Sequence, residues 1–248
     1  MKIFIFPNTT AQRYIDRLHK ALANLQADNE CSLNEEDCLR IFGNTDLVSF
    51  GVEDCEAIVS LGGDGTFLRA VQLALQNDKP VYGINCGRVG YLCRHNDHDD
   101  YDLSNLKCEE FALLEFENNG RTYYALNDVV AGKDYFGGTV ELGLSVAGQR
   151  IYDFWGDGII VSTPIGSTGY NRSAGGKILD ACDRKLAITP VCPTDQNIRQ
   201  LIVADDCTVT IDSLSSLYSS SVFADGQYAG VLDQLKVFLS KRKVKILK

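Results

Sequence analysis

The sequence predicts an α/β N-terminal domain, built on a Rossmann-like parallel sheet, followed by a β-rich C-terminal domain with layered, sandwich-like sheets. Over the first hundred residues, apolar strand patterns alternate with segments of helical spacing, which is typical of a parallel sheet covered by helices. Hairpin turns and short apolar runs dominate the rest. A charged segment, RHNDHDDYD (94–102), lies between the two patterns. We therefore expect two domains, 1–98 and 99–248.

In the N-terminal part, each element has its own signal. KIFIF (2–6) predicts a strand ending at Pro7, and Thr10 can cap a helix whose apolar face comprises Tyr14, Leu18, Leu22 and Leu25. AIVSL (57–61) predicts a buried strand, 66–76 a helix, and PVYGIN (80–85) a third strand. In such sheets ligands bind at the carboxyl ends of strands, which is where GGDGT (62–66) lies.

In the C-terminal part, turn signals separate short strands. Asn119-Gly120 predicts a hairpin that joins two strands within 110–132, and a second pair turns near Gly148. IIVST (159–163) is another strand. The later runs predict separate strands of a sandwich: LAITPV, LIVA, CTVTI, SVFA, LKVFLS and KVKIL.

Composition excludes several classes of partner. The chain has 248 residues, 45% of them hydrophobic, and a net charge of -9, which argues against a surface for nucleic acid or anionic membranes. No segment approaches the roughly 18 apolar residues of a membrane span. We expect a cytoplasmic protein.

Cysteine and histidine spacing indicates no metal site held by the protein. The nine cysteines form no C-x-x-C pair, and their odd number favours reduced thiols over a disulfide framework. His95 and His98 are the nearest candidates for zinc, but the acidic run around them favours a solvated linker.

The glycine-rich GGDGT loop has two interpretations. The chain lacks the P-loop, G-x-G-x-x-G and G-x-S-x-G signatures, so P-loop kinases, simple dinucleotide dehydrogenases and serine hydrolases lose support. Glycines followed by a helix N-terminus suit a phosphate. Asp64 would repel that phosphate unless it accepts a proton or shares a metal ion, so it indicates chemistry. The alternative is a structural Asp-Gly turn.

Two further clusters add polar groups to apolar strands. GDGIIVSTPIGSTGYNRSAGG (156–176) offers hydroxyls, close backbone approach and a stacking face on Tyr170, as a nucleoside pocket needs, although an ordinary glycine-rich loop has the same composition. In LNDVVAG (126–132), Asn127 and Asp128 form either hydrogen-bonded structure or a ligand-facing edge. An amide beside a carboxylate suits the vicinal hydroxyls of a ribose.

The chain resembles the NAD kinase family in four motifs that occur in the family's order. They are GGDGT, GINCGRVGYL (83–92), the Asn-acid pair and DGIIVSTPIGSTGYNRSAGG. The resemblance covers about 57–177, with weaker agreement to the end that includes FADGQ (223–227). The glycine-serine-threonine block is its specific part, because lipid kinases and phosphofructokinases carry loops similar to GGDGT.

This resemblance implies phosphoryl transfer from ATP, or polyphosphate in some members, to the 2'-hydroxyl of the adenosine ribose of NAD. It places the dinucleotide between the two domains, Mg2+ on the donor, and a homodimer or homotetramer. Asp64 would be the proton acceptor. The residues implied in binding are Gly63, Gly65 and Thr66 for phosphates, Asn127 and Asp128 for the ribose, Thr168, Gly169, Tyr170, Asn171 and Ser173 around the adenosine, and Asp157 and Gln227 elsewhere on the dinucleotide.

Four positions depart from the family pattern and keep alternatives open. Asp128 stands where glutamate is usual, Ile165 where threonine is usual and Gly169 where alanine is usual. Trp155 replaces a polar or basic residue. The alternatives are a catalytically weak NAD(P)-binding sensor and a lipid kinase of the GGDGT type.

Overall fold

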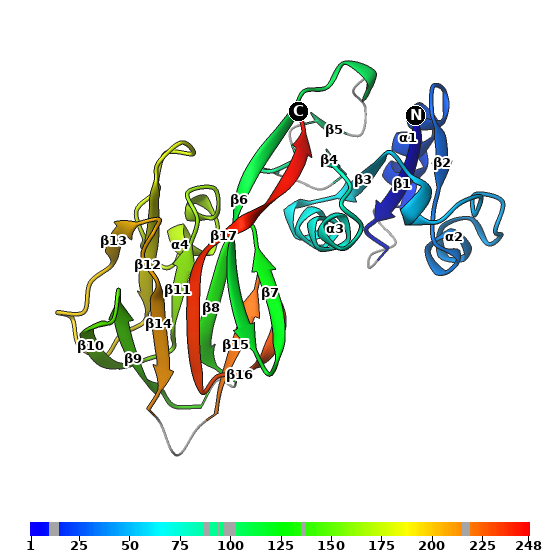
Figure 1. Cartoon of the computed structure of the whole chain (residues 1–248). Coiled ribbons are helices and arrows are strands. Elements are labelled where there is room, and N and C mark those ends of the chain that lie inside the picture. Colours follow the sequence, from blue (N-terminus) through cyan, green and yellow to red (C-terminus); the bar gives the residue numbers. More distant parts are fainter. Residues whose placement is uncertain (10–14, 87–89, 94, 97–102, 135–136, 215–218) are drawn as a thin grey trace. The chain divides into compact units, whose positions relative to one another are not determined.

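A computed structural model of the chain describes residues 1–9, 15–86, 90–93, 95–96, 103–134, 137–214 and 219–248. It divides the chain into an N-terminal unit, Met1–Phe111 with Val244–Lys248, and a C-terminal unit, Ala112–Lys243 (Figure 1). The division lies later than the expected 98/99 boundary, and the last five residues join the first unit. The acidic run that suggested the earlier boundary lies mostly outside the described residues.

The N-terminal unit is built on a parallel sheet. Its strands β1 (Lys2–Pro7), β2 (Glu30–Ser32), β3 (Ala57–Gly62) and β4 (Val81–Asn85) lie in the order β4-β3-β1-β2. The short β5 (His95–Asn96) and the end of β17 (Gln234–Leu247) also pair in parallel with β4. The α/β prediction is confirmed.

Helices cover both faces of this sheet. The helices α1 (Ile15–Gln26) and α2 (Glu35–Phe42) pack on one face, in a core cluster with Ile3, Ile5 and Ile84. On the other face Gly83 approaches the ring of Phe67 from α3 (Asp64–Asn77), because a Cβ at Gly83 would lie 2.8 Å from that ring. The expected cap Thr10 lies outside the described residues.

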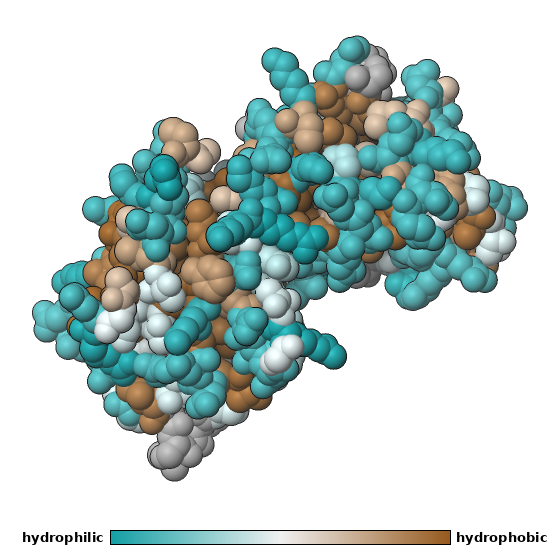
Figure 2. Space-filling view, in the orientation of Figure 1, coloured by the Kyte–Doolittle hydropathy of each residue, from teal (hydrophilic) through white to brown (hydrophobic). Residues whose placement is uncertain are grey.

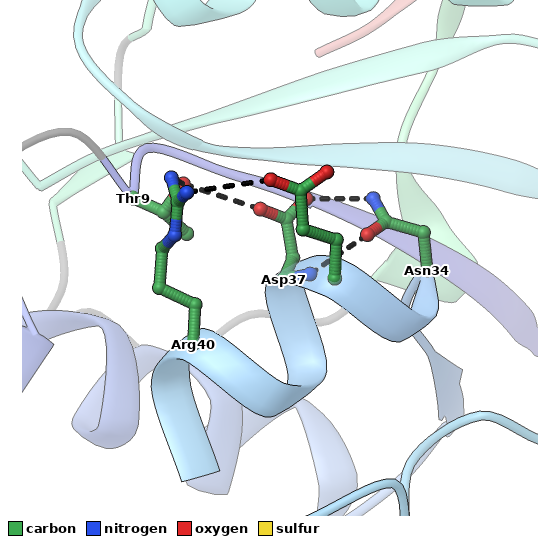
Figure 3. A network of polar contacts seen from close by, with 5 residues as sticks. Thr9, Asn34, Asp37 and Arg40 are labelled. Carbon is green, nitrogen blue, oxygen red and sulfur yellow. Dashed lines mark hydrogen bonds and ion pairs between the residues drawn. The ribbon is translucent and has the colours of Figure 1, made fainter. Parts of the chain in front are cut away.

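The sequence patterns did not predict the helix α2. A polar network anchors this helix (Figure 3). Asn34 is its N-cap, and the Asn34 side chain accepts a bond from the Asp37 N–H at 2.8 Å. The Thr9 hydroxyl donates to Asp37, and Arg40 donates in turn to Thr9. The segment after β1 is thus tied to α2.

The C-terminal unit is a sandwich of two sheets. The first contains β9 (Val140–Val146), β10 (Gln149–Gly156), β14 (Val209–Ser213) and β17, with β6 (Cys108–Asn118) and β7 (Arg121–Ala125) following from β17. The second has six antiparallel strands in the order β13-β12-β11-β8-β15-β16: Leu201–Ala204, Lys185–Val191, Gly158–Ser162, Asp128–Lys133, Ser220–Ala224 and Gln227–Val231. Apolar side chains from both sheets form one core cluster. The layered β-rich prediction is confirmed.

The two predicted hairpins are present, with positive φ angles at Asn119 and Gly120 and at Ala147 and Gly148. Two strand predictions were wrong. The runs LKVFLS and KVKIL form one continuous strand, β17. The segment 121–132, expected as one strand, is two strands in different sheets, with Leu126 and Asn127 between them.

Among the described residues, no helix is long and apolar enough to cross a membrane. Hydrophilic and hydrophobic residues are intermingled on the face shown in Figure 2.

Candidate functional site

The GGDGT loop joins the end of β3 to the start of α3 and fixes the position of Asp64. Gly63 is the N-cap of α3 and Asp64 its first residue. The Asp64 carboxylate accepts bonds from the backbone N–H groups of Tyr91 at 2.9 Å, Leu92 at 3.1 Å and Cys93 at 3.3 Å. Asp64 therefore holds the 91–93 segment against the helix N-terminus. The interpretation of GGDGT as a simple Asp-Gly turn does not include this contact.

The glycines of this loop leave space beside the helix N-terminus. A Cβ added to Gly63 or to Gly65 would meet no heavy atom within 4 Å. The first N–H groups of a helix have no partner within it, and the helix dipole favours negative charge there. Thr66 differs, because its side chain is buried and would touch a Cβ on Gly62 at 2.5 Å. The loop can hold an anion beside Gly63 and Gly65. The buried Thr66 side chain instead packs inside the loop.

In the C-terminal unit, Asn127 and Asp128 lie where the chain passes from one sheet to the other. The Asp225 carboxylate accepts bonds from the N–H groups of Leu126 at 2.7 Å, Asn127 at 2.8 Å and Asp128 at 3.2 Å. The sequence does not predict Asp225 as a site residue, although its turn, FADGQ, is part of the family resemblance. An Asp-Gly pair between two apolar runs was the signal for a structured hairpin that could have found it.

Asp128 and Asp225 form a buried acidic pair. Burial, and then the charge of Asp225, raises the pKa of Asp128 to about 7. Burial also raises the pKa of Asp225 to about 6, although the three backbone N–H groups oppose this rise. The three N–H groups stabilise the ionised form of Asp225, so Asp128 is the carboxyl group of the pair that holds a proton more readily.

The Asn127 side chain carries an acceptor with no partner. Its Oδ1 atom is buried and receives no hydrogen bond from any described residue. Its backbone carbonyl, in contrast, accepts the Thr163 N–H at 2.9 Å. A buried acceptor without a partner is costly, so Asn127 Oδ1 suits a ligand hydroxyl or amine.

The loop after β11 packs against this segment. A Cβ on Gly166 would lie 2.0 Å from the Asn127 carbonyl oxygen, so only glycine allows this approach. Gly169 lies near the Asn127 side chain, since its Cβ would be 3.7 Å from Nδ2. The structure thus brings the start of the 168–173 segment beside Asn127.

The predicted residues of this loop divide into exposed and buried. Tyr170 and Ser173 are exposed and Thr168 is half-buried. Asn171 is fully buried, and its amide donates to the carbonyls of Ser167 at 2.9 Å and Lys177 at 3.0 Å. Its Oδ1 accepts the Thr189 hydroxyl at 2.6 Å. The Asn171 side chain is occupied within the protein.

The last two predicted residues, Asp157 and Gln227, lie outside the glycine-rich loop and the Asn127–Asp128 segment. Asp157 precedes β11, whereas the glycine-rich loop follows it, so the five residues of this strand separate them within one chain. Asp157 pairs with Lys133, their Oδ1 and Nζ atoms being 2.6 Å apart. Gln227 is exposed and begins β16, directly after the Asp225 turn.

No metal site is formed by the described residues. Within the described ranges, no group of three His, Cys, Asp or Glu side chains is arranged to hold a metal ion. All nine cysteines are free.

The fold and these loops define a class of protein. A parallel α/β unit with a GGDGT loop at a strand end, and a β-sandwich unit with a hydroxyl-rich glycine loop, together describe a two-domain nucleotide kinase of the GGDGT type. Two family models match the chain: the ATP-NAD kinase N-terminal domain over 5–102 and the ATP-NAD kinase C-terminal domain over 126–248. The chain belongs to the NAD kinase family, so a lipid kinase is not favoured.

Individual relatives agree with this assignment. An NAD kinase of Lachnoclostridium phytofermentans is 32% identical over 236 residues, covering 87% of this chain and 82% of that protein. The fold is similar to that of yeast NADH kinase complexed with NADH, with a TM-score of 0.83, 20% identity, and coverage of 100% of this chain and 83% of that one. An NAD kinase from Archaeoglobus fulgidus in complex with ATP gives a TM-score of 0.77 at 24% identity, with coverage of 100% and 94%.

Proposed function

We propose that the protein transfers a phosphoryl group from ATP to the 2'-hydroxyl of the adenosine ribose of NAD, forming NADP. The observation that carries this proposal is the match of both halves of the chain to the two ATP-NAD kinase domains. The open glycine loop and the unpartnered Asn127 acceptor support it independently.

Phosphate binding is assigned to the start of α3. Gly63 and Gly65 have no Cβ, and the helix N-terminus behind them offers N–H donors to phosphate oxygens. Thr66 acts from inside the loop, since its side chain is buried. These donors would neutralise part of the charge that builds up on the transferred group, which is the main requirement of phosphoryl transfer.

Ribose binding is assigned to Asn127 and Asp128, with Thr168, Gly169, Tyr170 and Ser173 around the adenosine. Tyr170 is exposed and can offer its ring for stacking. Asn171 keeps this loop in place through its buried hydrogen bonds, so we assign it a structural contribution. Asp157 and Gln227 are assigned to other parts of the dinucleotide.

Asp64 is assigned as the proton acceptor. Three backbone N–H groups orient its carboxylate, and a carboxylate has lone pairs for about four bonds. As the 2'-oxygen attacks the γ-phosphorus, its proton passes to Asp64, the bond from phosphorus to the bridging oxygen breaks, and ADP leaves. We expect Mg2+ to be bound to ATP and to supply charge neutralisation on its phosphates.

Donor range, assembly and location are also part of the proposal. We expect ATP to be used, with polyphosphate as a second donor to be tested. We expect a homodimer or homotetramer, as the resemblance to the NAD kinase family implies, with Asp157 contacting the dinucleotide across a subunit interface. The nine free cysteines suit the reducing cytoplasm.

A coupled assay tests the activity directly. The protein is incubated with NAD and MgATP, and NADP is detected by a dehydrogenase specific for NADP. Parallel reactions replace ATP by polyphosphate and NAD by NADH. Steady NADP formation supports the kinase, whereas NAD binding in calorimetry without any NADP would instead support a dinucleotide-binding sensor.

A further inference from the structure

Asp225 lies at the tip of the β15–β16 hairpin, yet its side chain is buried. Asp225 and Gly226 have φ angles of 49° and 76°, the pattern of a two-residue type I′ turn. Side chains at such turns are usually solvated. Only 9% of the surface of Asp225 is exposed.

The buried carboxylate fixes the backbone of the proposed ribose-binding segment. It accepts three N–H groups, from Leu126 to Asp128, and the Asp225 N–H returns a bond to the Asp128 carbonyl at 3.0 Å. Bonds from N–H groups to a carboxylate are stronger than those between neutral groups. The orientation of Asn127 and Asp128 therefore depends on Asp225.

The acidic pair has no cationic partner among the residues that the structure describes. Asp128 is 6% exposed, and among the described residues no Lys, Arg or His forms an ion pair with Asp128 or Asp225. From β11, the residue opposite Asp128 is the uncharged Ser162. From the β15–β16 hairpin, the residue that faces Asp128 is Asp225 itself. Two adjacent buried carboxyl groups cannot both ionise cheaply.

We propose that Asp225 is a positioning residue which keeps its charge on the three N–H donors and leaves a proton on Asp128, so that Asp128 donates a hydrogen bond to the bound dinucleotide. The Asn127 acceptor and the Asp128 donor then lie on adjacent residues, which suits a pair of ribose oxygens. This inference depends on the proposed function for the identity of the ligand.

The electrostatics of the pair agree with this assignment. Burial and the charge of the neighbouring Asp225 raise the pKa of Asp128 to about 7. Affinity for NAD should consequently decrease as the pH rises through 7, and binding near pH 7.5 should take up protons.

Asp225→Asn tests the role while preserving the turn. Asn-Gly is the preferred pair for a type I′ turn, and asparagine tolerates positive φ. The variant loses the charge, so the pKa of Asp128 falls. A fall of one unit would weaken NAD binding at pH 7.5 roughly tenfold, with most of the affinity regained near pH 5.5. Calorimetric titration with NAD alone measures both values.

Asn118→Leu is the matched structural control. Asn118 anchors the same hairpin from β6 by donating to the carbonyls of Ala229 and Val231 at 3.0 and 3.1 Å. This variant should lower the melting temperature but keep the wild-type dependence of NAD affinity on pH. If Asp225→Asn behaves in the same way, Asp225 is only structural and the proposal is overturned.

A measurement on the wild type covers the case in which Asp225→Asn does not fold. Calorimetry of NAD binding in two buffers of different ionisation enthalpy should show proton uptake near pH 7.5 that Asp128→Asn abolishes. Equal heats in both buffers would overturn the proposal. Absence of NADP formation would count against the kinase function alone, because these experiments measure binding without turnover.

Discussion

The carboxylate of Asp64 accepts the backbone N–H of Tyr91 at 2.9 Å, joining the first residue of α3 to the segment after β4. The same carboxylate receives the N–H groups of Leu92 and Cys93. A side chain held by three donors keeps a fixed orientation. Asp64 thereby combines a structural contribution with the proposed chemical one, and substitution should separate them.

Asp64→Asn should abolish turnover while leaving NAD affinity largely intact. Asparagine keeps one acceptor for the 91–93 segment but cannot take up the ribose proton, and loss of a general base costs about 10²–10⁴-fold in rate. Steady-state kinetics gives kcat, and calorimetry gives the affinity. Asp78→Asn, at the other end of α3, is the control, because asparagine also suits its left-handed C-cap. Near-normal turnover in Asp64→Asn would remove Asp64 from the mechanism.

Asn171→Ala should destabilise the protein strongly. The change leaves the carbonyls of Ser167 and Lys177 and the Thr189 hydroxyl without the amide, and each unpaired buried group costs about 1–3 kcal/mol. Urea denaturation should show a loss of at least about 2 kcal/mol. Ser173 is exposed in the short helix α4 (Tyr170–Ser173), which also contains Asn171, and Ser173→Ala should stay within about 0.5 kcal/mol of wild type. Equal stability of the two variants would contradict the structural assignment of Asn171.

Gly166→Ala and Gly169→Ala should differ in stability although they lie in one loop. At Gly166 the new Cβ would lie 2.0 Å from the Asn127 carbonyl oxygen, so backbone must move, at a cost of about 1–3 kcal/mol or more. At Gly169 the nearest atom, the Gly166 carbonyl oxygen, is 3.3 Å away, and a small shift accommodates it. Thermal unfolding of both variants checks the order. A more stable Gly166→Ala would show that the loop can leave Asn127.

The fold could be predicted largely from local patterns. Alternating β-branched and helical runs such as 57–61 and 66–76 indicated the parallel sheet, and Asn119-Gly120 indicated a hairpin, because these signals depend on neighbouring residues. The break between β7 and β8 was different. It depends on Asp225, 97 positions from Asp128 along the chain, whose carboxylate takes the place of strand pairing at Leu126 and Asn127.

The candidate site divides in the same way. Asp64, Asn127 and the 166–173 loop stood out because polar or glycine residues interrupted apolar runs. The sequence pattern could not predict whether each of these side chains faces a ligand or the protein interior. Asn171 and Tyr170 are adjacent in sequence, yet the amide is buried among Ser167, Lys177 and Thr189, and the ring is exposed. Only tertiary packing makes that distinction.

The contribution of Asp128 to stability should decrease as the pH rises from about 4 to 7. Its pKa is raised in the folded protein to about 7, whereas an unfolded aspartate titrates near 4. Between these values the unfolded chain releases a proton that the folded protein retains, so the free energy of unfolding falls with pH. The effect disappears below pH 4, where both states are protonated.

Denaturation of wild type and Asp128→Asn at several pH values isolates this effect. The asparagine does not titrate, so the wild-type free energy of unfolding minus that of the variant should decrease from pH 4 to 7, by on the order of a few kcal/mol. Ser173→Ala, at an exposed position whose side chain does not titrate, should give a difference that does not change with pH. If the Asp128 difference instead grew with pH, a cation would have to neutralise Asp128, and the acidic pair would be incorrectly assigned.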